Sequence, residues 1–87
     1  MHEASLMKGL MQKIGEVAAN EGASRVVAVE VWLGALSHMS ATHFAEHFAQ
    51  ASAGTMAEGA RLDVTVSADT AHPNAQDILL VSVEVQA

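Results

Sequence analysis

The first third of the chain changes from a helical to an alternating pattern of apolar positions. Between residues 4 and 21, apolar side chains recur every three or four positions, which predicts a helix. Its stripe contains Leu6, Leu10, Ile14 and Val17, with Met7, Met11 and Ala18 beside them. Gly22 follows, where helices commonly end. Residues 25–33 then alternate, which predicts a strand. Its apolar face contains Val27, Val29, Val31 and Leu33, and its other face Ala28, Glu30 and Trp32.

The remainder of the chain predicts a second helix and two further strands. Ser40 is suited to cap a helix that extends to about residue 53. Phe44, Phe48 and Ala51 would share one face of this helix. Alternation returns at residues 62–66 and at residues 79–85, so both segments are predicted as strands. In the last strand the predicted apolar face comprises Leu79, Val81, Val83 and Val85. Residues 68–77 contain the only proline, Pro73, and are predicted as a loop.

The predicted order α-β-α-β-β indicates an α+β fold, with two helices on one face of a three-stranded sheet. If the first two strands are neighbours, the helix between them allows a parallel, right-handed crossover. The last two strands are expected to form an antiparallel pair. With 87 residues, we expect one domain over residues 1–87.

Composition and charge exclude several kinds of function. Four Lys and Arg against ten Asp and Glu give a net charge of −6, so nucleic acid is not expected as a partner. The absence of cysteine excludes disulfides, thiol nucleophiles and cysteine-bound zinc or iron–sulfur centres. The longest apolar stretch, residues 26–36, is interrupted by Glu30 and is short for a membrane span. We therefore expect a cytoplasmic protein without a membrane partner.

Dispersed segments of the chain match the pattern of a known family. They are MHEASLM at residues 1–7, RVV and LGALS at 25–27 and 33–37, GTMAEGARL at 54–62 and VSVEV at 81–85. In this order they resemble the HypA/HybF family of hydrogenase nickel-incorporation accessory proteins. The resemblance covers residues 1–67 and, less closely, residues 78–86. It implies a nickel-binding domain.

The loop of residues 68–77 departs from that family. Its members insert a zinc domain with two Cys-x-x-Cys pairs between the last two strands, whereas this chain has no cysteine there. The segment His72-Pro73-Asn74-Ala75 could be the remnant of a Cys-Pro-x-Cys knuckle. We therefore expect a short loop in place of the zinc domain, and no structural zinc.

The first three residues form a candidate metal chelate, provided that the chain begins at a free Met1 amine. That amine and the His2 amide nitrogen close a five-membered ring on a metal, and the His2 amide and Nδ1 close a six-membered ring. Three nitrogens in one plane suit Ni(II) or Cu(II) better than tetrahedral Zn(II). The resemblance suggests the Glu3 peptide nitrogen as fourth ligand, and the imidazole of His72 or His38 is the alternative. Because the amine must lose its proton, binding should weaken as the pH falls.

From spacing alone, an exposed terminus is the simpler interpretation of His2 and Glu3, and it is the resemblance that favours nickel. The segment from His43 to His47 spells H-x-x-E-H, a zinc-protease pattern. Two histidines four residues apart share a helix face, so a weak metal contact is feasible. A hydrolase would also need a third ligand and a cleft. We therefore expect this pair to lie on a solvated helix face.

Trp32 is expected on the open face of the sheet, together with Ala28, Ile78 and Leu80. Such an apolar patch would suit a partner or a second copy of the chain, with Trp32 and Leu80 as interface residues. The alternative is that loops cover Trp32 or that it closes the edge of the core.

The resemblance and the N-terminal pattern together imply a non-enzymatic nickel metallochaperone that holds Ni(II) transiently and delivers it during [NiFe]-hydrogenase maturation. By resemblance, its partners would be a HypB-like GTPase and the hydrogenase large subunit. The alternative is an adaptor that binds maturation partners or self-associates without carrying metal. The missing zinc domain favours this alternative.

Overall fold

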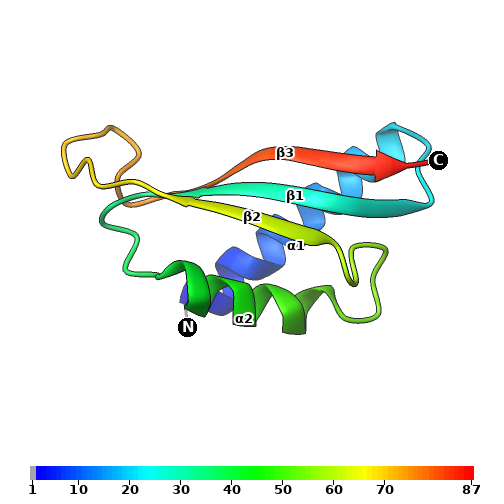
Figure 1. Cartoon of the computed structure of the whole chain (residues 1–87), viewed down its shortest axis with the longest axis horizontal. Coiled ribbons are helices and arrows are strands. Elements are labelled where there is room, and N and C mark those ends of the chain that lie inside the picture. Colours follow the sequence, from blue (N-terminus) through cyan, green and yellow to red (C-terminus); the bar gives the residue numbers. More distant parts are fainter. Residues whose placement is uncertain (1) are drawn as a thin grey trace.

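The computed structural model describes the backbone of residues 2–87 and the side chains of residues 5–87. Its elements are α1 (His2–Asn20), β1 (Arg25–Leu33), α2 (Ala41–Ser52), β2 (Arg61–Val66) and β3 (Ile78–Gln86). Both helices lie on one face of the three-stranded sheet (Figure 1). The predicted α+β fold and its element order are therefore confirmed. None of the described helices is long and apolar enough to span a membrane.

The sheet has the strand order β2-β1-β3, so β1 is its central strand. β1 and β2 are parallel, as predicted, with Val31 opposite Val64. The predicted pairing of the last two strands is wrong, because β3 pairs antiparallel with β1 at its other edge. This order is favourable because β1 is the most deeply buried strand, and a central position supplies hydrogen-bond partners along both of its edges.

The loop between β2 and β3 carries the chain past the end of β1, from one edge of the sheet to the other (Figure 1). Backbone hydrogen bonds fix both of its ends. The Ser67 N–H donates to the Leu33 carbonyl, and the Gly34 N–H donates to the Asp77 carbonyl, each over 2.9 Å. A Cβ atom at Gly34 would overlap the backbone of Ala75. Glycine is therefore required where the loop crosses the end of β1.

The core lies between the sheet and the two helices. Its buried side chains are Met7, Leu10, Ile14 and Ala18 of α1 and Val26, Val29, Val31 and Leu33 of β1. The remainder come from α2 and its flanks and are Met39, Phe44, Phe48 and Ala57. The predicted α1 stripe is wrong at its start, since Leu6 is 47% exposed whereas Met7 is 6% exposed. The long, flexible Met7 side chain fills this part of the core in its place.

Two irregularities in the sheet register correct the predicted strand faces. The pairing shifts between Val26 and Ala28, so Val26 and not Val27 joins the core. A second shift lies between Glu30 and Val31, where Val81 is the extra residue of β3. An extra residue reverses the alternation of side chains beyond it. Ile78 and Leu80 consequently pack against the core, and Leu79 and Val81 are exposed.

Candidate functional site

The candidate nickel chelate lies at the start of α1. Met1 and the side chains of His2 and Glu3 lie outside the described residues, so the structure leaves their role as ligands a prediction. The backbone of His2 and Glu3 forms the first turn of α1. The first four N–H groups of a helix have no carbonyl partner within it. The two amide nitrogens that the chelate would use are therefore not engaged in hydrogen bonds of this helix.

The first part of α1 packs beside the start of α2. Met7 shares a core cluster with Met39 and Phe44, and the same residues line one groove. Figure 1 shows the beginnings of both helices at the same end of the molecule.

His43 and His47 lie on the outer face of α2, His43 exposed and His47 half-buried. Their Nε2 atoms are 3.1 Å apart, and their ring centroids are 4.6 Å apart. The buried Phe44 and Phe48 each follow one of these histidines and lie about 100° further round the helix. Among residues 5–87, no three His, Asp or Glu side chains come together as a metal site. The zinc-protease interpretation of this motif therefore lacks a third ligand within that range.

The two alternative imidazole ligands lie in different environments. His38 is exposed in the connection between β1 and α2, with a left-handed φ of 61°. His72 is half-buried, and its ring lies 4.8 Å from the Trp32 ring. The His72 Nδ1 accepts a hydrogen bond of 2.9 Å from the Asn74 N–H. His72 is thus held by its own loop, on the sheet face that carries no helices, whereas His38 precedes the core residue Met39.

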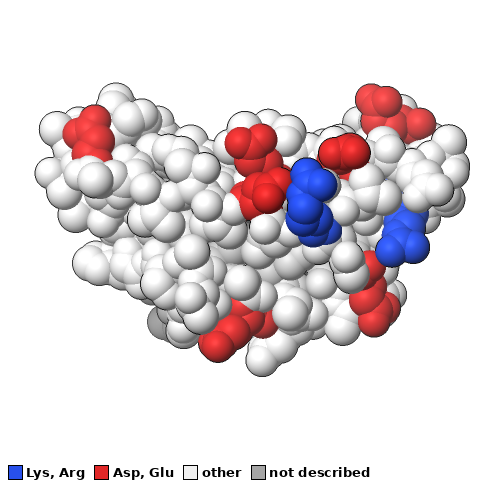
Figure 2. All heavy atoms as spheres, viewed as in Figure 1, with Lys and Arg blue, Asp and Glu red and all other residues white. Residues whose placement is uncertain are grey.

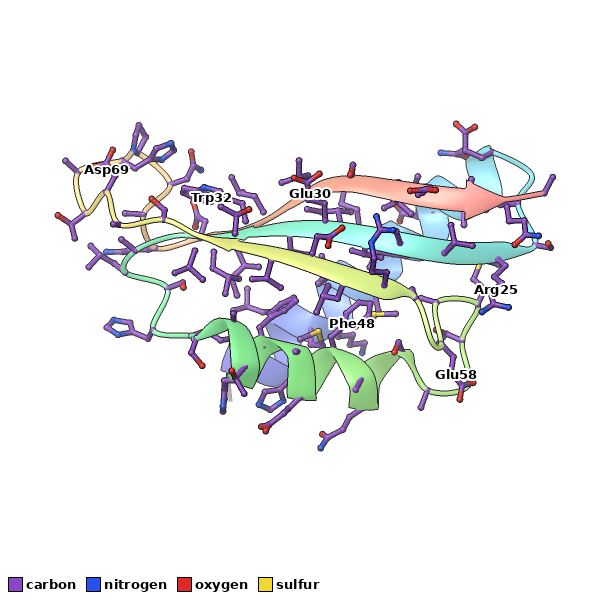
Figure 3. The ribbon with its side chains drawn as sticks, viewed as in Figure 1. Arg25, Glu30, Trp32, Phe48, Glu58 and Asp69 are labelled. Carbon is purple, nitrogen blue, oxygen red and sulfur yellow. The ribbon has the colours of Figure 1, made fainter. Side chains whose placement is uncertain are left out.

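Trp32 lies near the loop end of β1 (Figure 3), with Thr65 and Leu79 as its neighbours across the sheet. It is half-buried, and His72 covers part of its ring. The predicted patch of Trp32 with Ile78 and Leu80 is wrong, because those two side chains face the core. Sequence reasoning missed Leu79 as the neighbour of Trp32. The uninterrupted apolar run Ile78-Leu79-Leu80-Val81 carries no alternation that could have shown which residues face outward.

The middle of the open sheet face is acidic. Glu30, Asp63 and Glu84 lie there around Arg61, whose guanidinium is 3.1 Å from Asp63 and 4.0 Å from Glu84. The Ser82 hydroxyl donates a 3.1 Å hydrogen bond to Glu30. Figure 2 shows these charges as a mixed cluster over the strands. The apolar part of this face is therefore confined to the end near Trp32.

Leu80 lines a groove on the other side of the sheet, between α1 and β3. The groove has a volume of about 800 Å³, and its α1 wall includes the exposed Leu6 and the buried Leu10. Trp32 and Leu80, the two candidate interface residues, thus lie on opposite faces of the sheet. They cannot belong to one continuous patch.

Comparisons with known proteins agree with the resemblance. A family model described as "Hydrogenase/urease nickel incorporation, metallochaperone, hypA" matches residues 1–76. The hydrogenase maturation factor HypA of Roseiflexus sp. (strain RS-1) is 42% identical over 64 residues, which are 74% of this chain and 52% of that protein. The hydrogenase maturation factor HypA of Thermococcus kodakarensis is 40% identical over 63 residues, which are 72% of this chain and 45% of that protein. The chain spans about half the length of the curated relatives that it matches.

The fold is also similar to solved structures. The solution structure of the Ni metallochaperone HypA from Helicobacter pylori superposes with a TM-score of 0.79 at 21% identity, covering 98% of this chain and 97% of that chain. A second structure, described as "Solution structure of HypA protein", superposes with a TM-score of 0.76 at 22% identity. It covers 98% of this chain and 96% of that chain. At such identities the likeness shows the fold alone. The match of the family model to residues 1–76 shows the family, and the chain belongs to the HypA family.

Proposed function

We propose that this chain is a non-catalytic nickel carrier that supplies Ni(II) during [NiFe]-hydrogenase maturation. The observation that carries this proposal is the sequence Met1-His2-Glu3 at the start of the chain. This segment belongs to the part of the chain, residues 1–76, that matches the HypA family model, and α1 begins within it. The names of the matched relatives, which are hydrogenase maturation factors, support the assignment of the process.

The proposed ligands are nitrogens of the first three residues. In a chain that begins with a free Met1 amine, this amine, the His2 amide and the His2 Nδ1 would bind Ni(II), with the Glu3 amide in the fourth position. Loss of an amide proton leaves a negative charge, which the positive end of the α1 dipole stabilises. Of the imidazole alternatives for the fourth position, His38 is favoured over His72. His38 adjoins Met39, which packs with Met7 of α1, whereas the Nδ1 of His72 is engaged within its own loop.

Transient binding follows from the position of this chelate. Ligands at the end of a chain can be displaced one at a time by a competing site, so the metal can be passed on without unfolding the domain. The partners that we propose are a HypB-like GTPase and the hydrogenase large subunit, or a second copy of this chain. Trp32 on the open face and Leu80 in the groove between α1 and β3 are candidates for two separate contact surfaces.

We propose that the domain needs no structural zinc. The chain has no cysteine, and backbone hydrogen bonds from Ser67, Gly34 and Leu36 hold the loop where relatives of this family carry a zinc domain. The second candidate function is an adaptor that binds the same partners without metal. The groove between α1 and β3 favours it, because a docking surface of this kind does not depend on the chelate.

Nickel titration of the untagged chain distinguishes these two functions. The carrier should hold one equivalent of its Ni(II) in a square-planar complex with visible d–d absorption, and His2→Ala should abolish that band. If the chain beginning at Met1 develops no such band, the carrier proposal is wrong and the adaptor remains.

A further inference from the structure

His43 and His47 lie one turn apart on α2, with their Nε2 atoms 3.1 Å apart. Two nitrogen ligands at about 2.0–2.1 Å from one metal lie roughly 2.9 Å apart at a right angle and roughly 3.3 Å apart at the tetrahedral angle. The observed separation falls between these values. The separation is therefore compatible with both nitrogens binding one ion.

The helix beneath the pair holds the two histidines in place. The Ser40 hydroxyl caps α2 by accepting a hydrogen bond from the His43 N–H over 3.1 Å. On the inner face, Phe44 and Phe48 are 1% and 3% exposed, and their rings stack 6.4 Å apart. Because Ser40 caps the start of α2 and the buried Phe44 and Phe48 side chains anchor the helix to the core, the backbone positions of His43 and His47 are set by the fold. A metal would not have to order this helix in order to bind.

We propose that His43 and His47 form a second metal site, which binds a late first-row divalent ion such as Ni(II) through two imidazole nitrogens, with water completing the coordination. Two neutral imidazoles suit Ni(II), Cu(II) and Zn(II), and they do not suit Mg(II), which prefers oxygen ligands. The site lies near the start of α2, at the end of the molecule where α1 begins. Its two ligands differ from those proposed for the N-terminal chelate.

Nickel titration of the His2→Ala chain by calorimetry isolates this site from the chelate. We expect this chain to bind one Ni(II) ion, and to bind Cu(II) more tightly and Mg(II) not at all. Removing a group that merely supports a metal ligand typically lowers affinity by 10-fold to 100-fold, so removing a ligand should cost about tenfold or more. Adding either His43→Ala or His47→Ala should therefore lower the Ni(II) affinity by at least this factor.

A matched control keeps the number of histidines and changes only their spacing. The chain with His47→Ala and Ala45→His carries its two histidines two residues apart, where helix side chains do not face one another. Ala45 is exposed, so the added ring meets no core residue. This control should bind Ni(II) as weakly as His47→Ala alone. All variants should stay folded without metal, because neither histidine belongs to the buried core.

Diamagnetic Zn(II) provides a second, residue-specific measurement on the unaltered chain. On addition of Zn(II), the NMR signals of the His43 and His47 rings should shift together, and those of His38 and His72 should shift less. The proposal is overturned if the His2→Ala chain binds no nickel, or if the control with altered spacing binds as tightly as its parent. A failure of the N-terminal chelate would show itself separately, as equal nickel binding by the native and His2→Ala chains.

Discussion

Trp32 and His72 lie with their ring centroids 4.8 Å apart, although one belongs to β1 and the other to the loop that joins β2 to β3. The contact closes the loop over the end of the open sheet face. A hydrogen bond from the Asn74 N–H to the His72 Nδ1 also orients the His72 ring. Trp32 is thereby partly covered by the loop between β2 and β3.

Removing the His72 ring should expose Trp32. In His72→Ala, the tryptophan fluorescence should shift to longer wavelength, and acrylamide should quench it more efficiently. Loss of the ring contact and of the hydrogen bond from Asn74 should lower the free energy of unfolding by about 1 kcal/mol. His38→Ala is the matched control, because His38 is exposed in another loop. Unchanged emission in His72→Ala would contradict the contact.

Alanine at Gly34 should be strongly destabilising. Its Cβ atom would overlap the Ala75 carbonyl, so β1 or the loop would have to move. Overpacking of this kind typically costs about 1–3 kcal/mol of unfolding free energy, which urea denaturation would measure. Gly9→Ala is the control, since nothing lies within 4 Å of a Cβ at that position in α1. That change should instead stabilise the domain by about 0.5–1 kcal/mol. Equal stability of the two variants would show that the loop does not cross Gly34 as described.

One residue added before Met1 should lower nickel affinity about as much as His2→Ala does. The addition converts the Met1 amine into an amide and moves the new amine away from the chelate rings, although His2 is still present. In the native chain, affinity should rise with pH, because binding releases protons. Calorimetric nickel titrations of the three chains at two pH values measure both effects. If the extended chain binds nickel as tightly as the native one, the amine is not a ligand.

The protein should purify without stoichiometric zinc and should keep its fold in a chelator. The loop of residues 67–77 is fastened to β1 by backbone hydrogen bonds, which a chelator does not affect. Elemental analysis and circular dichroism in the presence of EDTA test this expectation. One tightly bound zinc per chain, or unfolding on chelation, would reveal a structural site that uses side chains other than cysteine.

Two substitutions on opposite sides of the sheet distinguish the candidate contact surfaces. Trp32→Asp alters the open face, and Leu6→Asp alters the exposed wall of the groove that Leu80 lines. Neither side chain belongs to the buried core, so both variants should stay folded. Association with a partner, or with a second copy of the chain, should weaken in one of them and not in the other. A Trp32→Asp chain that fails to fold would place Trp32 among the residues that stabilise the domain.

Local patterns in the sequence were sufficient for the secondary structure. The bounds of β1 and the Ser40 cap were predicted correctly, because alternation and capping depend on residues close together in the chain. The position of β1 between β2 and β3 was not, because strand order depends on contacts between distant segments. The extra residues at Val27 and Val81 likewise carry no local signal, and the one at Val81 turns Leu80 from the predicted open face toward the core. The contact between Trp32 and His72 depends on the same strand order, so it could not be predicted either.

Both ends of the loop of residues 67–77 are bonded to consecutive residues, Leu33 and Gly34. The chain thus leaves the sheet and returns to it at the same end of β1, on its two sides. Lengthening a closed loop costs little, about 0.6 kcal/mol for each doubling of its length. The sheet is therefore built so that the segment between these two bonds can grow into a separate folded module, or shrink to a short connection, while every strand keeps its neighbours. Gain or loss of a whole domain at this point needs no redesign of the remaining protein.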